Sequence, residues 1–493
     1  MSSYDSSVEE TLDPEDWSSL RQLGHRMVDD MLDYLQDVRQ RPVWQPLLPE
    51  AKEQLHQPLP QEPQPFEAVY QDFLEYVLPY PMGNIHPRFW GWVIGTGSAS
   101  GMLAEMLAAA MNPNVGHGEH VAMYVETQVV EWLKQLVGYP AASSGLLVSG
   151  GSMANLVGLT VARAAKAGFD VRKEGLQGSG RYLTAYASVE THSCIKKGME
   201  LLGLGRQALR LIAVDENFRI DLKALAEAIQ ADRAAGHQPM LVIGNAGTVN
   251  TGAIDDLPAL ADLCRQEDLW FHVDGAIGGV AAGSPNLRPL LAGMEQADSL
   301  AIDLHKWMYM PYEIACALVR DAGAHRQAFA ENPEYLAHTG RGLAGGAVWF
   351  SDLGVQLSRG FRALKAWMLI KEHGAQKYGR MVEQNGAQVR YLAGRVDDTQ
   401  ELERLAPAPL NILCFRYNPG GLDEATLDKL NQELLLRLHE SGIAAPSYTR
   451  LNGRYTLRVA NTNHRSRRED FDLLVETVLR MGRDLAKEYH PAR

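Results

Sequence analysis

The chain has 493 residues, of which 46% are hydrophobic and 22% charged, and its net charge at pH 7 is −13. This length can bury a large core and is typical of two or three folding units. The negative charge argues against binding to nucleic acid or to an anionic membrane, and no apolar run is long enough to cross a bilayer. Residues 1–16 are acidic and polar, so we expect neither a secretory signal nor a transit peptide. Four scattered cysteines without metal-ligand spacing indicate reduced thiols in a cytoplasmic protein.

The N-terminal region combines predicted helices with a proline-rich strap. A helix start signal lies at Asp13-Pro14-Glu15, and apolar residues recur at helical spacing between residues 20 and 38. Residues 41–65 hold so many prolines that no regular helix is expected there, and a second helix is predicted from residue 65 to about 78. Such an arm has no core of its own, so it should lie on another surface, for example a second subunit. A flexible tail is the alternative.

Residues 83–100, GNIHPRFWGWVIGTGSAS, place three aromatic side chains on a backbone rich in glycine. This composition suits a pocket for an apolar ligand and ordinary core packing equally well. Apolar stripes then predict helices over residues 102–111 and 121–137.

Strand-like apolar runs alternate with helix-like stretches from about residue 145 to 320. This alternation indicates an α/β domain with a mostly parallel sheet that is covered on both faces. Ligands of such sheets bind beyond the carboxyl ends of the strands. The predicted strands are 146–149, 182–188, 209–214, 239–245, 269–274, 299–303 and 315–321, and the predicted helices are 152–167, 221–235, 257–267 and one from residue 193.

The pattern changes beyond residue 320. Residues 332–354 are rich in glycine, and a loop of this length is usually a functional lid or disordered. A long helix is predicted from about 358 to 381 and beyond, followed by a smaller α+β unit with strands near 410–417 and 455–461 and helices near 424–439 and 468–489. We therefore divide the chain into an N-terminal helical arm (1–85), a large α/β domain (86–375) and a small C-terminal α+β domain (376–493).

Lys306 ends the segment SLAIDLHKW, which begins with an apolar run. Burial lowers the pKa of a lysine and yields the neutral amine that attacks a carbonyl group to form a Schiff base. On this basis we expect a lowered pKa for Lys306. A surface lysine beyond a strand is the simpler interpretation of the dipeptide alone.

Two further motifs lie at predicted strand ends. Ser149-Gly150-Gly151-Ser152 stands between a strand and a helix, where exposed amides attract an anion, although such turns also serve as plain connectors. It matches neither the dinucleotide fingerprint nor the P-loop. Asp274 could keep a heterocyclic nitrogen protonated, although a helix cap or turn residue is the commoner role. An anion site, an aspartate and a lysine are what pyridoxal phosphate requires.

In combination the motifs resemble the group II pyridoxal-phosphate-dependent amino acid decarboxylases, and among these the aromatic-L-amino-acid decarboxylases. The resemblance covers most of the chain. It implies fold type I, the aspartate aminotransferase-like fold of pyridoxal-phosphate-dependent transferases, and a homodimer whose active site lies at the subunit interface and whose arms clasp the partner. The motifs are HPRFWGW (86–92), VSGGSMAN (148–155), THSCIKKG (191–198), GNAGTVNTGAIDD (244–256), WFHVDGAIGG (270–279), ADS and DLHKW (297–307) and NPEYLAH (332–338).

The resemblance also implies a role for each matching residue. Lys306 would carry the cofactor as a Schiff base, and Asp274 would hold the pyridine nitrogen protonated. Further roles fall to residues around the ring and the phosphate: stacking by His192 with Ala276 on the other face, phosphate binding by Gly151, Ser152 and His305, a contact of Thr248 with the cofactor or His192, and protonation of the substrate carbon after loss of carbon dioxide by Tyr335.

Substrate choice is less closely determined by the resemblance. Trp92 and Val93, with Trp90 beside them, stand where relatives line the side-chain pocket, which favours an aromatic or bulky apolar amino acid. Ser358 gives a slight preference for tyrosine or DOPA over tryptophan, whereas 114–116 depart from the aromatic-rich segment of the animal enzymes. Asp303 replaces an asparagine of those enzymes. Because a carboxylate repels a phosphate, we expect Asp303 to point elsewhere or to act through a donor.

These observations predict decarboxylation of an aromatic L-amino acid to its amine. An aldehyde synthase is one alternative, since a phenylalanine at the position of Tyr335 accompanies aldehyde formation in plant and insect relatives. A decarboxylase of acidic amino acids is another, and a basic residue directed at the substrate side chain would support it. A catalytically silent relative that binds a partner protein is the third.

Overall fold

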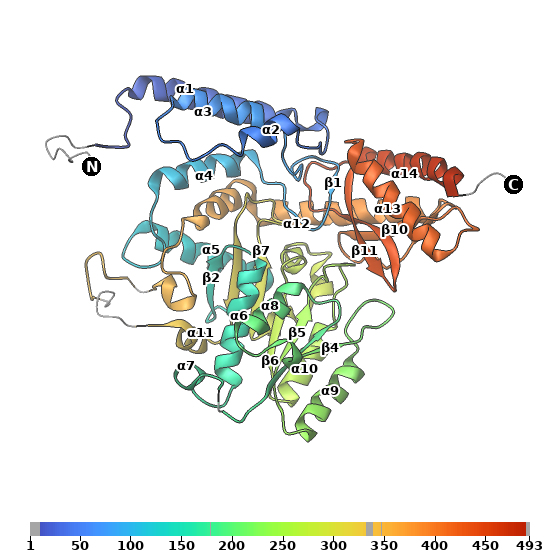
Figure 1. The fold of residues 1–493 in the computed structure, drawn as a ribbon. Helices are drawn as coiled ribbons and strands as arrows, with labels where there is room; N and C mark the ends of the chain where they lie inside the picture. Colours follow the sequence, from blue (N-terminus) through green and yellow to red (C-terminus); the bar gives the residue numbers. More distant parts are fainter. Residues whose placement is uncertain (1–9, 178, 332–338, 347, 490–493) are drawn as a thin grey trace.

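The computed structural model describes residues 10–177, 179–331, 339–346 and 348–489. The chain forms an N-terminal helical arm, a large domain around a seven-stranded sheet and a C-terminal domain around a five-stranded sheet (Figure 1). None of the helices in these ranges combines the length and the apolar character needed to span a membrane.

The large sheet has the strand order β2-β8-β7-β6-β5-β3-β4. Neighbouring strands from β4 to β7 are parallel, whereas β8 runs antiparallel to both β7 and β2. The predicted α/β fold with a mixed, mostly parallel sheet is therefore confirmed. The strands are β2 (Ser144–Val148), β3 (Leu183–Ser188), β4 (Leu209–Ile212), β5 (Gln238–Asn245), β6 (Trp270–Asp274), β7 (Ser299–Asp303) and β8 (Ala315–Val319).

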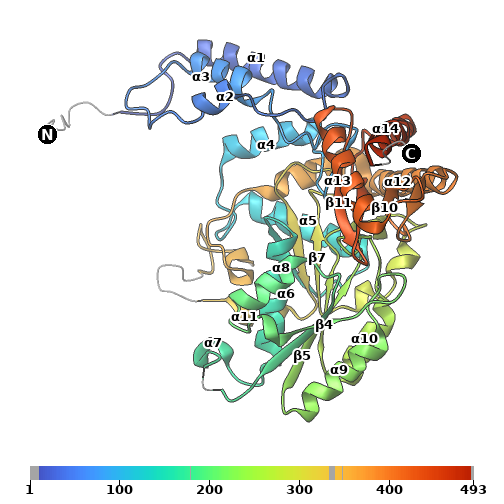
Figure 2. The ribbon, with the colours of Figure 1, turned by 45° about the vertical axis from the view of Figure 1, so that its right-hand side comes forward.

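Helices cover both faces of this sheet (Figure 2). The reason is visible in β5, where Leu241 and Ile243 pack with α6 and α8 while Val242 packs with α9 and α10 on the other side. Strands that are apolar on both faces need two helical layers. The helices are α4 (Ala99–Met111), α5 (Val121–Val137), α6 (Gly151–Lys166), α7 (Val171–Glu174), α8 (Ser193–Leu201), α9 (Leu222–Ala234), α10 (Leu257–Gln266) and α11 (Ala322–Phe329).

The C-terminal sheet has the order β1-β11-β12-β10-β9 and packs against α13, α14 and the second part of the long helix α12. Its first strand comes from far upstream, because β1 (Phe89–Trp90) pairs in parallel with Ala445 and Pro446 of β11. The predicted boundary at residue 86 placed this segment in the large domain, whereas its hydrogen bonds join it to the small one. The other elements are β9 (Leu402–Arg404), β10 (Ile412–Tyr417), β11 (Ala445–Leu451), β12 (Arg454–Ala460), α13 (Glu424–Glu440) and α14 (Arg468–Tyr489).

One long helix, α12 (Arg362–Asp397), connects the two domains. Its first part packs on α4 and α5, and its second part packs on β9, β10 and α14. The helix is interrupted at Gly374, whose backbone has φ 72° and ψ 151°. A positive φ favours glycine, so this residue permits the break.

The N-terminal arm lies at one end of the molecule beside α4 (Figures 1 and 2). It contains α1 (Trp17–Gln36), α2 (Pro49–Gln54), α3 (Phe66–Asp72) and a π-helical turn (Phe73–Val77). Helix α1 begins after Asp16, whose carboxylate accepts from the amides of Ser18 and Ser19, and not at the predicted signal three residues earlier. The proline-rich strap holds the short helix α2, because Pro49 occupies a first-turn position that needs no amide donor.

Candidate active site

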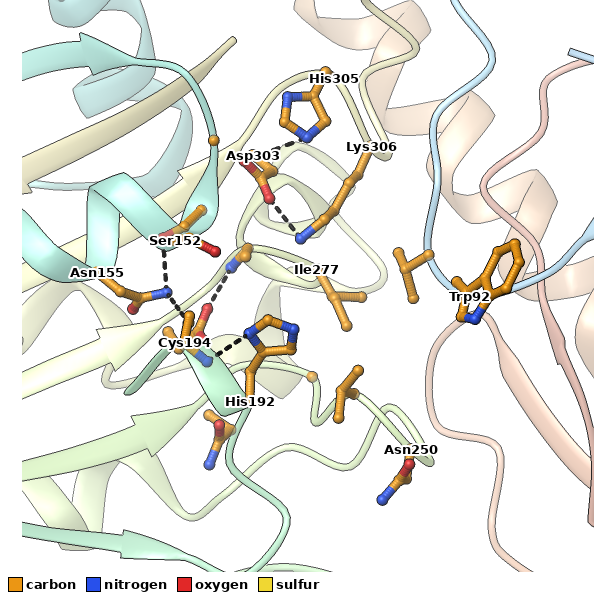
Figure 3. Close-up of a pocket in the computed structure, with 18 of the residues that line it drawn as sticks. Trp92, Ser152, Asn155, His192, Cys194, Asn250, Ile277, Asp303, His305 and Lys306 are labelled. Atoms are coloured by element: carbon orange, nitrogen blue, oxygen red, sulfur yellow. Dashed lines mark hydrogen bonds and ion pairs between the residues drawn. The ribbon is translucent and has the colours of Figure 1, made fainter. Parts of the chain in front are cut away.

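A cavity of about 460 Å³ lies at the carboxyl ends of β2, β5, β6 and β7, between the large sheet and the C-terminal domain. Figure 3 shows the side chains of Ser152, His192, Asp303 and Lys306 gathered around one space, with Trp92 across from them. The parallel strands explain this convergence, because their carboxyl ends share one edge of the sheet.

The wall formed by Gly150 and Gly151 is the start of helix α6. Gly150 is the N-cap, and the amides of Met153 and Ala154 donate to its carbonyl oxygen. The preceding amides of Gly151 and Ser152 lie at the positive end of the helix, beside the cavity. A Cβ on Gly151 would lie 2.7 Å from Oδ2 of Asp303 and 3.0 Å from Cβ of Ala276, so a larger residue here would have to displace its neighbours. This wall can hold an anion such as a phosphate group.

Asp274 ends strand β6 and is 7% exposed. Its Oδ1 accepts the main-chain N–H of Ala276 at 3.1 Å, which fixes the carboxyl group at the cavity wall. Burial raises the pKa of Asp274, while Lys306 and His192 oppose that rise. A protonated ring nitrogen placed here would stabilise the carboxylate in the same way as those cations.

His192 is the N-cap of helix α8, and its Nδ1 accepts the main-chain N–H of Cys194 at 3.2 Å. Burial lowers the pKa of His192, so the imidazole is neutral and carries its hydrogen on Nε2. Using a ring nitrogen as the helix cap fixes the plane of the ring at the cavity wall. A ring held in this way can stack on a flat ligand.

Lys306 is held in an ion pair, with its Nζ 2.5 Å from Oδ2 of Asp303. Burial acts to lower the pKa of Lys306, but the carboxylates of Asp303 and Asp274 outweigh it and raise the pKa above its ordinary value. The expected lowering is therefore wrong for this chain, because the sequence did not show that Asp303 faces the amine. Asp303 itself points into the cavity and not away from it.

His305 shares the wall with Asp303. Its Nδ1 accepts the main-chain N–H of Ile314 at 3.2 Å, and its Nε2 lies 3.8 Å from Oδ1 of Asp303. The ring of Tyr312 covers it at a centroid distance of 4.4 Å. Burial lowers the pKa of His305, so the neutral ring presents an Nε2–H donor. This donor can bind an anionic oxygen.

Together these groups fit pyridoxal phosphate. The amides of Gly151 and Ser152 at the start of α6 and the ring of His305 border the cavity, where they can donate to a phosphate group. Asp274 suits the ring nitrogen, and the amine of Lys306 suits the aldehyde. The sequence profile described as "Pyridoxal-dependent decarboxylase conserved domain" matches residues 49–418.

The chain belongs to the pyridoxal-dependent decarboxylase family. It is 32% identical over 476 residues to the aromatic-L-amino-acid decarboxylase of Bacillus atrophaeus, covering 95% of this chain and 97% of the relative. It is 30% identical to tryptophan decarboxylase 2 of Oryza sativa, covering 92% of each.

Solved structures agree with this assignment. The structure of Oryza sativa TDC with PLP and tryptamine has a TM-score of 0.88 and 28% identity, and the match covers 96% of this chain and 100% of that one. Tryptophan decarboxylase of Catharanthus roseus in complex with L-tryptophan has a TM-score of 0.86 at 26% identity, with the same coverage. The predicted fold type I architecture, the pyridoxal phosphate cofactor and the activity of an amino acid decarboxylase are confirmed.

Most residues predicted to bind the cofactor of this decarboxylase line the cavity, and Thr248 differs from them. Gly151, Ser152, His192, Asp274, Ala276, His305 and Lys306 all border the cavity, as do the predicted substrate residues Trp92 and Val93. The hydroxyl of Thr248 instead accepts the main-chain N–H of Ala253 at 3.1 Å inside the following turn. Tyr335 lies outside the described residues.

Ser358 lies away from this cavity, and so do residues 114–116. These two segments contact each other: the amide of Arg359 donates to Oδ1 of Asn114 at 2.9 Å, and the amide of Val115 donates to the carbonyl oxygen of Arg359 at 2.8 Å. Ser358 is exposed there. Both segments are thus separate from the cavity of the same chain, and Asn114 and Ser358 are exposed whereas Val115 and Gly116 are buried.

Sequence reasoning missed Arg458 of strand β12, which is 4% exposed and lines the cavity. Its guanidinium donates to the main-chain carbonyls of Trp92, Val249 and Asn250. The ion pairs among the described residues include none with Arg458, and burial lowers its pKa to about 10. The one available signal was a charged residue inside the apolar run YTLRVA.

Proposed function

We propose that this enzyme converts an aromatic L-amino acid into the corresponding amine and carbon dioxide. The main support is the apolar part of the cavity lining, which consists of Trp92, Val93 and Ile277. Trp92 lies across the cavity from Asp303 (Figure 3). The names of the relatives, tryptophan, tyrosine and aromatic-L-amino-acid decarboxylases, support the same substrate class. An indole or phenol ring gains stability by leaving water for such a surface.

Arg458 bears on the alternative of an acidic substrate. It lines the cavity together with Lys306, His192 and His305, and these three are assigned to the cofactor, which leaves Arg458 as the basic residue that could pair with a side-chain carboxylate. Its guanidinium is instead used by three main-chain carbonyls. An aromatic substrate requires no such partner and is therefore favoured.

Each residue of the site has a proposed task. Bound pyridoxal phosphate supplies an electron sink for the pair that remains on Cα when carbon dioxide leaves. Lys306 attaches the cofactor, and Asp274 keeps the ring nitrogen protonated. Gly151, Ser152 and His305 bind the phosphate, while His192 stacks on the ring against Ala276. By fixing the ring plane, these residues let the site orient the Cα–carboxylate bond perpendicular to it.

The final proton is assigned to Tyr335. Its phenol would protonate Cα after decarboxylation, and protonation there leads to the amine and not to an aldehyde.

A homodimer is part of the proposal. The arm supports it, because only Leu23 is buried within the 20-residue helix α1 and Trp17, Phe66 and Val69 are exposed. The exposed positions of Asn114 and Ser358, away from the cavity of their own chain, support it too, since a second copy could receive these side chains at its own cavity. The four cysteines are free and buried, which fits the proposed cytoplasmic location.

A product assay across the standard amino acids and DOPA tests the substrate class. We expect the largest kcat/KM for tyrosine, DOPA, tryptophan or phenylalanine, with one amine formed per carbon dioxide. A preference for glutamate or another acidic amino acid would contradict the proposal. Peroxide and aldehyde in place of amine would identify an aldehyde synthase.

A further inference from the structure

Asp303 is a buried carboxylate whose charge is balanced by one close cation. It is 1% exposed, and among the described residues no neutral donor forms a hydrogen bond with its oxygens. The ion-pair contacts of this carboxylate are with Nζ of Lys306 at 2.5 Å and Nε2 of His305 at 3.8 Å. Because the pKa of His305 is lowered by burial, Lys306 is the cation that balances Asp303. Inside the protein, one carboxylate charge is thus paired with one ammonium charge.

The same nitrogen of Lys306 is the proposed attachment point of the cofactor. An amine attacks an aldehyde through its lone pair, which the ammonium form lacks. Every contact that favours the ammonium form therefore opposes attachment. Asp303 is placed to be the strongest such contact, because a carboxylate and an ammonium group at hydrogen-bond distance form a charge-assisted pair.

Other charged groups surround Lys306 from each neighbouring element. Asp274 on β6 and Tyr312 from the loop after β7 also favour the ammonium form, whereas His192 before α8 is held neutral by burial. Lys197 of α8 and Lys365 of α12 act on His192 and His305 from farther out. Only Asp303 is within ion-pair distance of Lys306 among the described residues.

We propose that Asp303 competes with the cofactor for Lys306, so that this carboxylate slows cofactor loading. The inference rests on the proposed attachment at Lys306 and adds a control of cofactor uptake to it. Loading requires Lys306 to give one proton to solvent and leave Asp303. The neutral amine then forms a C=N bond with the aldehyde carbon, and the aldehyde oxygen departs in one molecule of water with the two amine hydrogens.

Pyridoxal, which lacks the phosphate group, separates two effects of Asp303. Its oxygen Oδ2 lies 2.7 Å from the position of a Cβ on Gly151, so Asp303 also faces the proposed phosphate site and repels an anion there. Competition for the amine slows loading with both pyridoxal and pyridoxal phosphate. Charge repulsion slows loading with pyridoxal phosphate alone.

The experiment follows the absorbance of the Schiff base by stopped flow after the cofactor-free enzyme is mixed with either aldehyde. We expect Asp303→Asn to load pyridoxal about tenfold faster at pH 7, since a change of one in the pKa changes the neutral fraction tenfold. Asp303→Glu should stay close to the wild type. Asp256→Asn is the matched control, because this exposed N-cap residue loses the same charge and asparagine caps a helix equally well. Its rate should equal that of the wild type.

If Asp303→Asn were loaded faster with pyridoxal phosphate but not with pyridoxal, the effect would be due to phosphate repulsion and the proposal would be wrong. An unchanged loading rate of Asp303→Asn with both aldehydes would also contradict it. Lys306→Ala separates this failure from failure of the attachment site, because a Schiff-base band that persists in Lys306→Ala would place the attachment elsewhere. If Asp303→Asn does not fold, the wild-type pH profile decides. The rate of loading with pyridoxal should follow the neutral fraction of Lys306 and should therefore still rise above pH 10, since an ordinary lysine has a pKa of about 10.4. A rate that becomes constant below pH 9 would contradict the proposal.

Discussion

The guanidinium of Arg458 donates to the main-chain carbonyl of Trp92 at 2.9 Å, which ties strand β12 to the turn that bears the proposed substrate wall. Trp92 has a φ of 52°, a left-handed conformation that a bulky residue rarely adopts without support. The same guanidinium reaches the turn at Val249 and Asn250. One side chain therefore holds the two walls of the cavity together.

We expect Arg458→Gln to lower Tm and to lower kcat/KM for the aromatic substrate by about tenfold or more, because each buried carbonyl left without a donor costs about 1–3 kcal/mol. The loss should appear mainly as a raised KM, since Trp92 belongs to the proposed substrate wall and not to the groups proposed to hold the cofactor. Arg454→Gln, on the same strand but half exposed and paired with Glu403, is the control. If Arg458→Gln retained wild-type KM, the positioning role would be wrong.

Lys306→Ala should abolish turnover and the visible absorbance that appears when pyridoxal phosphate is added. No other lysine borders the cavity among the described residues, so another amine has no access to the aldehyde. Circular dichroism of the variant should match the wild type. Turnover above background by the purified variant would remove Lys306 from the mechanism.

Gly151→Ala should weaken pyridoxal phosphate binding by about tenfold or more, because a displacement of the anion site that removes one charged hydrogen bond is worth about 1.5–3 kcal/mol. The new Cβ would lie 2.7 Å from Oδ2 of Asp303 and 3.0 Å from Cβ of Ala276. Gly150→Ala is the matched control, since its Cβ would make an ordinary contact of 3.4 Å with His305. Dissociation constants of pyridoxal phosphate can be measured by fluorescence titration. Equal values for the two variants would argue against a phosphate site at Gly151.

Tyr335→Phe should divert product from amine toward aldehyde, ammonia and peroxide, because the phenol that would protonate Cα is lost. The ratio of the two reactions is measured by quantifying the amine and, in a coupled enzyme assay, the peroxide. An unchanged yield of amine would transfer the proton-donating role to another group.

Three buried histidines should make the fold sensitive to mild acid. Burial lowers the pKa of His86, His272 and His325 to about 4. Because these rings would titrate near 6.5 when unfolded, the folded state binds fewer protons between those values. Their contribution to the free energy of unfolding therefore falls as pH drops from about 6.5 to about 4, by up to about 1.4 kcal/mol per pH unit for each ring. Ring signals in NMR should remain those of neutral imidazole at pH 5.5, and a midpoint near 6.5 would contradict this.

The sequence predicted the large sheet well because its strands are buried on both faces. Such strands leave continuous apolar runs, as in β6 and β7, and the chemical groups follow directly at their ends. Strand β11 was missed because Tyr448, Thr449 and Arg450 at its centre are exposed or partly exposed and break the apolar run. The pKa direction of Lys306 was wrong for another reason: only the fold shows that Asp303, three positions earlier, turns toward the amine.

The pairing of β1 with β11 has a consequence for protein synthesis. The amide of Trp92 donates to the hydroxyl of Ser447, which lies 355 positions later in the chain. An edge strand of the C-terminal sheet thus leaves the ribosome long before the strand it pairs with, and must wait for it. A fragment that starts at residue 376 would lack this strand and expose the bare edge of β11, which makes such a truncation prone to aggregate.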